Sequence, residues 1–284
     1  MSDSVTVIIS VYNNAEALKR TLWGFANQDH ENFHIVLADD GSSKEQIQEV
    51  EAQVRQLNLS ATHLWHEDRG FRKAEILNKA ILYSNTDRLI FVDADVIPRR
   101  DFVANHAKLL KPGFFITGGS HLHLPPDLQK KIDFELVESG ELFTLRYLLD
   151  FGVDEKKFRL RLEKYGAKAR FYDALFPRWK AFVGCNASCW RQHAISVNGF
   201  DESWGYGGTD MEFGKRLANL GVKSRRHSFS LTVLHQEHPR PYRDPEQVKQ
   251  NKRALSQLSR SSKTRVERGA DSRSISDIEV LYSA

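Results

Sequence analysis

Short apolar runs and amphipathic stretches alternate along the N-terminal third of the chain. The apolar runs predict buried strands at residues 5–10, 34–40, 61–66 and 88–95. Apolar residues at helical spacing predict helices between them, at residues 14–28, 43–58 and 73–84. Such alternation is typical of right-handed crossovers that build a mostly parallel sheet with helices on both faces. The expected fold class is therefore α/β.

The pattern changes in the second half of the chain. Residues 125–180 are rich in basic and aromatic residues at helical spacing, which predicts a helical insertion beside the sheet. A partner surface or an amphipathic membrane patch are the alternatives for this segment. Residues 246–284 are basic, polar and rich in Ser and Arg, so we expect a helical and mobile tail.

Composition narrows the class of protein. The chain has 284 residues, of which 40% are hydrophobic and 27% charged, as in an ordinary globular protein. No signal peptide and no membrane-spanning run is visible, so we expect a cytoplasmic protein, with peripheral contact at the inner membrane face as an option. The net charge of +4 is modest, and nucleic acid is not an expected partner. Cys185 and Cys189 are too few for a structural zinc site and are expected to be reduced thiols.

Acidic residues follow three of the predicted strands: Asp39-Asp40, Glu67-Asp68, and Asp93 with Asp95. Ligands of α/β sheets gather beyond the carboxyl ends of parallel strands, so these positions predict a site. One acidic strand end could instead be a helix cap, and Asp40-Gly41-Ser42-Ser43 has the composition of such a turn. The carboxylates of Asp93 and Asp95 alternate along the chain and can address one point, as a divalent cation with a phosphate requires.

These motifs resemble a known family. The stretches "TVIISVYNNAEALKRTL", "IVLADDGSS", "RGFRKAEILNKAI" and "LIFVDADVIP" follow one another as in the nucleotide-sugar half of family 2 glycosyltransferases of the GT-A fold. The resemblance implies that Ser10, Tyr12 and either Asp39 or Asp40 hold a uridine. It further implies that Asp95 ligates a metal and that Asp93 contacts the ribose or a metal-bound water. Ser10 stands where proline is usual in this family.

A second block sharpens the resemblance. The stretch "FVGCNASCWRQHAISVNGFDESWGYGGTDMEFGKRLANLG" is similar to the C-terminal block of β1,4-galactosyltransferases and of N-acetylgalactosaminyltransferase modules in bacterial chondroitin polymerases. There the acid after Gly-Gly-x is the catalytic base of an inverting transfer, which implies that role for Asp210. The acceptor sugar is expected to contact the preceding residues, namely Trp204, Tyr206, Gly207, Gly208 and Thr209.

Two further positions depend on the same block. Thr209 stands where the family usually has Glu, which puts the identity of the acceptor in question. Glu212 has two interpretations, a site residue or a first-turn acid that favours the helix dipole. "FRKAEILN" resembles a uridine-contacting segment of the galactosyltransferases, which implies that Phe71 lies near the base and Arg72 or Lys73 near the phosphates.

The metal site needs a further protein ligand besides Asp93 and Asp95. His235, in "LTVLHQEHP", lies where the related enzymes place a metal-binding His, and His238 is the second choice. Imidazole suits Mn²⁺ better than Mg²⁺, so Mn²⁺ is the first choice of cofactor and Mg²⁺ the second. His121 and His123 invite a zinc interpretation, but without further ligands at fitting spacing we expect them to line the edge of the site or pack locally.

The sequence therefore predicts a GT-A glycosyltransferase domain at residues 1–245. It consists of a nucleotide-sugar half at 1–124, the insertion at 125–180 and an acceptor half at 181–245. We expect transfer of a hexose or N-acetylhexosamine, with galactose or N-acetylgalactosamine favoured, from a UDP-sugar to a glycan or lipid-linked glycan in bacterial capsule or lipopolysaccharide synthesis. The alternatives are a nucleotidyltransferase, whose Gly- and Lys-rich phosphate loop is missing, and a non-enzymatic module that binds nucleic acid or membrane.

Overall fold

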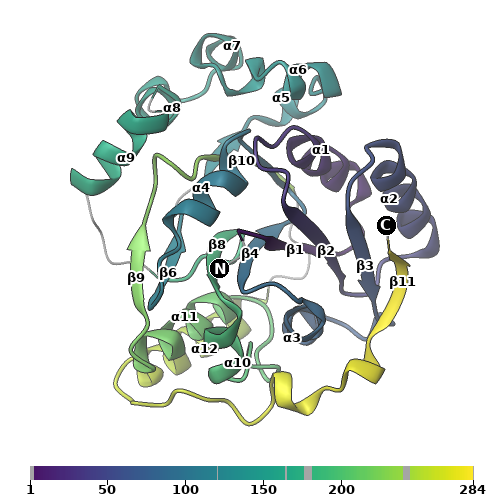
Figure 1. The fold of residues 1–284 in the computed structure, drawn as a ribbon, viewed down its shortest axis with the longest axis vertical. Helices are drawn as coiled ribbons and strands as arrows, with labels where there is room; N and C mark the ends of the chain where they lie inside the picture. Colours follow the sequence, from purple (N-terminus) through teal and green to yellow (C-terminus); the bar gives the residue numbers. More distant parts are fainter. Residues whose placement is uncertain (1–2, 120, 164, 176–180, 239–243, 284) are drawn as a thin grey trace.

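The centre of the protein is an eight-stranded sheet. The computed structural model describes residues 3–119, 121–163, 165–175, 181–238 and 244–283 (Figure 1). In the large sheet the strands follow the order β11-β3-β2-β1-β4-β8-β6-β9. Their bounds are β1 Val5–Val11, β2 Phe33–Asp39, β3 Ala61–Trp65, β4 Arg88–Asp93, β6 Phe114–Thr117, β8 Asn186–Trp190, β9 Lys223–Arg226 and β11 Glu279–Ser283.

The N-terminal part of this sheet is parallel, as its sequence predicts. Strands β3, β2, β1 and β4 all run in the same direction, so their carboxyl ends share one edge. The sheet as a whole is mixed, because β8 is antiparallel to β4 and β6, and β11 is antiparallel to β3. The prediction of parallel strands was right for β1 to β4, where a single helix joins consecutive strands. Strand β8 follows the long insertion, and a connection of that length does not fix the direction of the strand.

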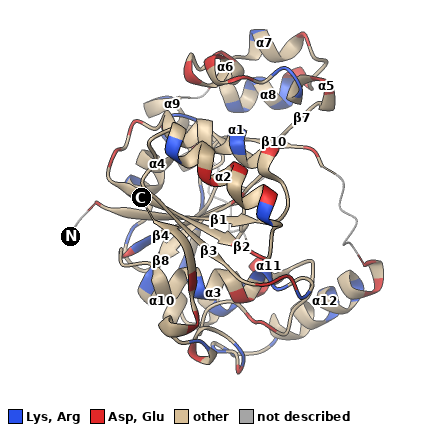
Figure 2. Cartoon of the chain, turned by 90° about the vertical axis from the view of Figure 1, so that its right-hand side faces the viewer, with Lys and Arg blue, Asp and Glu red and all other residues tan. Residues whose placement is uncertain are grey.

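Helices cover both faces of the sheet (Figure 2). One face carries α1 (Ala15–Ala26), α2 (Lys44–Gln56) and α4 (Phe102–Leu109), and the other carries α3 (Lys73–Tyr83), α10 (Arg191–Ser196) and α11 (Thr209–Asn219). Each face of the sheet has its own hydrophobic core. Alternate residues of β1 pack in the two cores, with Val7 and Ile9 in the first and Ile8 in the second. The α/β fold with helices on both faces is thus confirmed.

The predicted insertion forms a third layer that packs on a second, small sheet, whose strands all lie outside the insertion (Figure 1). That sheet has the order β5-β10-β7, with bounds Val96–Pro98, Val233–Gln236 and Leu122–Leu124. The helices are short: α5 Pro126–Gln129, α6 Phe134–Glu138, α7 Leu145–Leu149, α8 Glu155–Leu162 and α9 Gly166–Leu175, with a 3₁₀ turn at Glu141–Phe143. The apolar residues of α5 to α8 form a separate core against Ile97 and Leu234. Residues 176–180 of the predicted insertion lie outside the described residues.

Polar caps explain why the insertion is divided into short helices. The side chains of Asp133, Thr144 and Asp154 each accept a backbone N–H at the start of α6, α7 and α8. Each cap begins a new helix inside a stretch whose periodicity alone would predict a longer one. Within the parts of the chain that the structure describes, no helix has the length and apolar character needed to cross a membrane.

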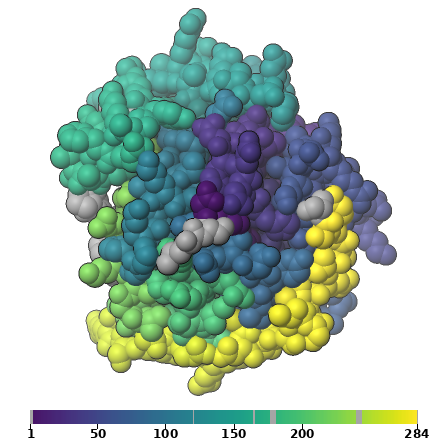
Figure 3. All heavy atoms as spheres, viewed as in Figure 1, coloured from purple at the N-terminus to yellow at the C-terminus, as the bar shows by residue number. Residues whose placement is uncertain are grey.

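The C-terminal segment differs from the expected mobile tail. Its helix α12 (Pro245–Leu258) packs on α11, and its last residues form β11 along the edge strand β3. Figure 3 shows this segment as a yellow band around one side of the molecule. Two side chains anchor it: Asn198 binds the backbone of Val266 and Asp271, and Arg273 pairs with Glu202 at 2.5 Å. This polar segment is therefore held on the protein by hydrogen bonds and an ion pair, and it does not depend on a large apolar face.

Candidate active site

Asp93, at the end of β4, is held by two partners from neighbouring elements. Ser10 at the end of β1 donates its hydroxyl to Asp93 Oδ1 at 2.7 Å, and Lys73 Nζ at the start of α3 donates to the same oxygen at 2.5 Å. Burial works against the charged form of Lys73, yet the carboxylates of Asp93, Asp210 and Asp95 raise its pKa above the usual range. Lys73 is therefore a permanent cation among three carboxylates.

Asp95 faces two imidazoles. Its side chain is nearly buried, and its Oδ2 lies 2.8 Å from His238 Nε2 and 3.4 Å from His235 Nε2. The other oxygen, Oδ1, is buried and has no hydrogen-bond partner among the described residues. The structure thus brings together the predicted ligands Asp95 and His235, and it adds the second choice, His238, which is the nearer of the two histidines. One carboxylate with two imidazoles is a donor set suited to a divalent transition-metal ion.

Asp210 lies in the first turn of α11. Gly207 and Gly208 precede this helix with φ of 98° and 100°, in the left-handed region that favours glycine. Asp210 Oδ2 accepts the backbone N–H of Gly184 at 3.0 Å, and Oδ1 accepts that of Met211 at 2.9 Å. Burial raises the pKa of Asp210, while these hydrogen bonds and the charge of Lys73 act in the opposite direction. A raised pKa suits a carboxylate that must accept a proton.

The Asp39-Asp40 pair divides into two roles. Asp39 is fully buried: its Oδ1 accepts the backbone N–H groups of Gly41 and Ser42, and its Oδ2 lies 2.9 Å from His63 Nε2. Asp40 is slightly more accessible and contacts His66 Nε2 at 2.7 Å and the backbone N–H of Arg72 at 2.9 Å. Asp39 therefore stabilises the turn after β2, and Asp40 is the better candidate for contact with a ligand.

Exposed aromatic rings stand beside Asp40. Tyr12 is 44% exposed, and its hydroxyl donates to Asp68 at 3.0 Å. Phe71 is 37% exposed and meets Tyr206 edge to face, with ring centroids 5.7 Å apart. Because Phe71 belongs to the predicted nucleotide side and Tyr206 to the predicted acceptor side, the two halves of the candidate site touch directly.

Arg72 and Lys73 point to different partners. The Arg72 guanidinium pairs with Glu75 at 3.2 Å and donates to the backbone carbonyl of Glu67. Glu75 also pairs with Lys79 and with Arg273 of the C-terminal segment. Of the two predicted phosphate-side residues, Lys73 is thus the one that reaches the Asp93 carboxylate.

Helix α12 supports the glycine-rich loop before Asp210. The amide of Asn251 donates to the carbonyls of Tyr206 at 3.1 Å and Gly207 at 2.8 Å, and Gln247 donates to Asn251 at 2.9 Å. A side chain at Gly208 would come within 3.3 Å of the Trp204 ring. The predicted acceptor residues Trp204, Tyr206, Gly207 and Gly208 therefore lie in one loop that leads into Thr209, the first residue of α11. The buried amide of Asn251 holds this loop in place.

Glu212 has a structural partner. It is 3% exposed and lies 2.7 Å from both the Nε and an Nη atom of Arg216, which also donates to the carbonyls of Val197 and Gly199. Of the two interpretations of Glu212, this pairing supports a structural one, although the partner is Arg216 and not the helix dipole alone. The pair anchors the helix that carries Asp210.

The histidines of "GGSHLHLP" lie beside His235, at the edge of the candidate site, which is one of the two positions that the sequence predicted for them. His121 and His123 have ring centroids 5.2 Å and 4.8 Å from that of His235, and His123 pairs with Glu237. His121 lies 3.3 Å from the Sγ of Cys185, one of two buried free thiols, whose pKa burial raises well above the usual value. The further ligand-type side chains that a zinc interpretation of His123 needs are therefore His235 of β10 and Glu237, which follows that strand.

Two family models match the segments that carry these residues. The model described as glycosyl transferase family 2 matches residues 6–128, which include Asp40, Asp93 and Asp95. The model described as the N-terminal domain of galactosyltransferase matches residues 175–239, which include Asp210 and His235. The chain is a glycosyltransferase whose residues 6–128 match family 2.

Curated relatives of this glycosyltransferase match most of its length. The uncharacterized glycosyltransferase YfnE of Bacillus subtilis (strain 168) is 27% identical over 87% of this chain and 68% of its own length. Chondroitin synthase of Escherichia coli is 25% identical over 84% of this chain, but the match covers only 35% of that protein. The chain therefore spans about two thirds of the first relative and one third of the second.

Solved structures show the fold of this glycosyltransferase. The mannosyltransferase PcManGT from Pyrobaculum calidifontis, in complex with GDP-Man and Mn²⁺, superposes with a TM-score of 0.56 at 21% identity, over 91% of this chain and 70% of its own. TarS 1–349 of S. aureus, in complex with UDP-GlcNAc, gives a TM-score of 0.57 at 16% identity, over 90% and 66%. Both support the GT-A architecture predicted from the sequence.

Proposed function

We propose that this glycosyltransferase moves a hexose or N-acetylhexosamine from a UDP-sugar to a glycan acceptor, with inversion at the anomeric carbon. The observation that carries the proposal is the 2.5 Å ion pair between Lys73 and Asp93, because the carboxylates of Asp210 and Asp95 also raise the pKa of this lysine. The metal motif and the predicted base thereby share one site at the carboxyl edge of the parallel strands. Nucleotidyl transfer or pure binding would not require the base.

The donor is proposed to be a UDP-sugar of the galactose or N-acetylgalactosamine type. Tyr12 and Phe71 offer partly exposed rings for the base, beside the carboxylate of Asp40. Support for UDP comes from the TarS complex with UDP-GlcNAc, although PcManGT holds GDP-Man. The preference for galactose-type sugars is supported by the galactosyltransferase model and by the similarity to chondroitin synthase.

The residues around Asp95 fit a divalent cation. Its buried Oδ1, which has no hydrogen-bond partner among the described residues, and the two imidazoles near Oδ2 offer oxygen and nitrogen ligands. Asp95, His235 and His238 would therefore hold the ion, with Asp93 alongside. Mn²⁺ is proposed ahead of Mg²⁺ because imidazole is a poor ligand for Mg²⁺. Such an ion supplies positive charge to the diphosphate of the donor.

The chain's own residues account for the proton and the direction of attack. The Asp210 carboxylate takes the proton from the acceptor hydroxyl while that oxygen forms a bond to the anomeric carbon. The bond from that carbon to the diphosphate breaks on the opposite face, and UDP leaves with the electron pair. Backbone N–H groups of Gly184 and Met211 fix the carboxylate, so the base is oriented before the acceptor binds.

The acceptor is proposed to be a bacterial surface glycan, of capsule or lipopolysaccharide type, free or lipid-linked. Trp204 and Tyr206 would offer ring faces to a sugar. Thr209 stands where the family usually has Glu, so the acceptor would not contact a carboxylate at this position. Cytoplasmic location with contact at the inner membrane face is part of the proposal. Leu160 and Phe171, 49% and 61% exposed on the basic helices α8 and α9, support that contact.

The donor proposal is tested by a screen of nucleotide sugars in Mn²⁺. We expect UDP release to be fastest with UDP-galactose or UDP-N-acetylgalactosamine and to increase when a glycan acceptor is added. GDP-mannose and UDP-glucose are the controls for base and epimer. Turnover with the GDP-sugar alone would overturn the proposed donor, and a product whose NMR spectrum shows the anomeric configuration of the donor would overturn inversion.

Asn251→Ala is expected to weaken use of the acceptor while leaving the donor site intact. The change removes the donor to two loop carbonyls, and a lost buried hydrogen bond costs about 1–3 kcal/mol. We expect kcat/KM for the acceptor to fall about tenfold, with the KM for the donor within about twofold. Gln257→Ala, an exposed amide on the same helix, is the matched control. Equal losses for donor and acceptor would contradict a role confined to the loop.

A further inference from the structure

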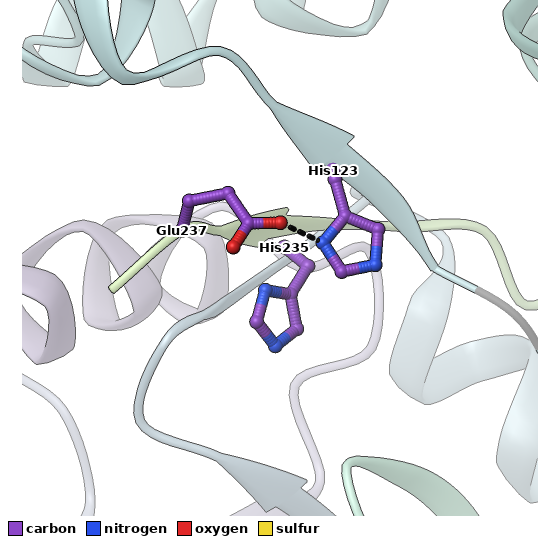
Figure 4. Close-up of side chains that lie close together, drawn as sticks. All are labelled: His123, His235 and Glu237. Carbon is purple, nitrogen blue, oxygen red and sulfur yellow. Dashed lines mark ion pairs between the residues drawn. The ribbon is translucent and has the colours of Figure 1, made fainter. Parts of the chain in front are cut away.

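A second set of metal-ligating side chains lies beside Asp95. His123, His235 and Glu237 each offer one ligand atom, and these atoms all lie within 4.8 Å of one another. Figure 4 shows His123 and Glu237 facing each other over the ring of His235. None of the roles proposed above for donor, acceptor or base uses His123 or Glu237.

The fold itself sets this arrangement. Strands β7 and β10 are parallel neighbours, and His123 and His235 are register partners, so their side chains leave the small sheet on the same face. Glu237 follows β10 directly and forms an ion pair with His123 Nδ1. Two neighbouring strands and the residue after one of them therefore hold three ligands from distant parts of the sequence.

The ligand types point to zinc. Two imidazoles, one carboxylate and a water form a common tetrahedral set for Zn²⁺. Such a site binds Zn²⁺ more tightly than Mn²⁺, because affinity for nitrogen ligands increases along the first-row series. His123 and Glu237 are 42% and 41% exposed in their side chains, so an ion can enter from solvent, and the nearly buried His235 forms the floor.

His235 belongs to both sets of ligands. Its Nε2 lies 3.4 Å from Asp95 Oδ2, and a neutral imidazole ligates through only one ring nitrogen, because the other carries the proton. We propose that His123, His235 and Glu237 form a Zn²⁺ site, and that zinc bound there inhibits the enzyme by opposing the catalytic cation at Asp95. The two ions would repel each other and compete for one imidazole, so each lowers the affinity of the other.

Zinc binding is tested without donor or acceptor, so this arm does not depend on the proposed function. Untagged protein is titrated with Zn²⁺ in competition with a chromogenic chelator, and Co²⁺ serves as a probe whose visible absorption reports tetrahedral coordination. We expect one tight site in the wild-type protein, weakened at least tenfold in His123→Ala and in Glu237→Gln. His30→Ala, a histidine remote from the cluster, is the control.

Two results would overturn the proposed Zn²⁺ site. The first is Zn²⁺ binding that is unchanged in both His123→Ala and Glu237→Gln. The second is Zn²⁺ binding that is lost in His238→Ala but kept in His123→Ala and Glu237→Gln. Circular dichroism shows whether each variant is folded; because Glu237 is a partly exposed residue after the strand, its Gln variant keeps the test valid if His123→Ala does not fold.

The inhibitory effect rests on the proposed Mn²⁺-dependent transfer and is measured separately. With UDP-sugar and Mn²⁺ present, we expect micromolar Zn²⁺ to inhibit the wild type, and added Mn²⁺ to relieve the inhibition. His123→Ala and Glu237→Gln should keep Mn²⁺-dependent turnover and require at least tenfold more Zn²⁺. If zinc binds at the site but turnover is unaffected, the inhibitory part is wrong; if no turnover is seen without zinc, the proposed function fails while the binding result stands.

Discussion

Asp210→Asn is expected to reduce sugar transfer by roughly 10²- to 10⁴-fold, the usual contribution of a positioned general base. The substitution keeps the size of the side chain but removes the carboxylate that accepts the proton. Because Asp210 is neither the carboxylate proposed to contact the base nor one of the proposed metal ligands, affinity for UDP and Mn²⁺ should stay within about twofold. Transfer is measured as UDP release in the presence of acceptor, and the two affinities by calorimetry.

The control for this variant is Asp154→Asn, which removes a charge at the start of α8 but keeps an N-cap residue.

The wild-type rate should fall as pH drops through the pKa of Asp210. Because burial raises this pKa, the rate should fall at a higher pH than an ordinary Asp would give. Above that pKa, ionised Asp210 lowers the free energy of unfolding, so its raised pKa stabilises the fold only at acidic pH. Normal transfer by Asp210→Asn would refute the assigned base.

Asp95→Ala is expected to abolish tight binding of both Mn²⁺ and the UDP diphosphate, and to lower transfer about 10³-fold or more. The estimate follows from the several kcal/mol that a metal ion gives to charge stabilisation, at about 1.4 kcal/mol for each factor of ten. The variant leaves His235 and His238 without the carboxylate between them. Mn²⁺ binding is followed by electron paramagnetic resonance of the free ion, and UDP binding by calorimetry with and without Mn²⁺.

Asp127→Ala, an exposed acid in the first turn of α5, controls for a general loss of negative charge. Thermal unfolding with and without Mn²⁺ separates loss of the ion from loss of the fold. The wild type should be stabilised by Mn²⁺ and Asp95→Ala should not, because a ligand raises stability only when it binds the native state. Mn²⁺-dependent stabilisation that persists in Asp95→Ala would place the ion elsewhere.

The N-terminal half of the fold could be predicted from sequence because each element is set by local pattern. Apolar runs such as that of β1 alternate with helical periodicity, and short crossovers force β1, β2, β3 and β4 into one direction. The strand-end acids then fall on a common edge. The local pattern could not show that Asp39 and Asp40 have different roles, because Asp is favoured both in turns and in ligand sites.

The remaining features arise from contacts between distant segments. His123 contacts Glu237 only because β7 pairs with β10. The carboxylate of Asp210, the proposed base, accepts the backbone N–H of Gly184, and no side-chain motif in the sequence indicates this contact. Asn251 stands in what looks like an ordinary polar helix, yet it holds the glycine loop. The side chain of Asp244 caps the start of α12, but no local pattern shows which residues this helix contacts.

The strand register around β8 has an evolutionary consequence. The chain leaves the large sheet after β6 and returns at β8, where Ala187 is the register partner of Thr117. The long excursion between them begins and ends at adjacent points, so its length can change without altering the order of the strands. We therefore expect related enzymes to differ in the length of the helical part of this excursion while the order of the strands in the large sheet is kept.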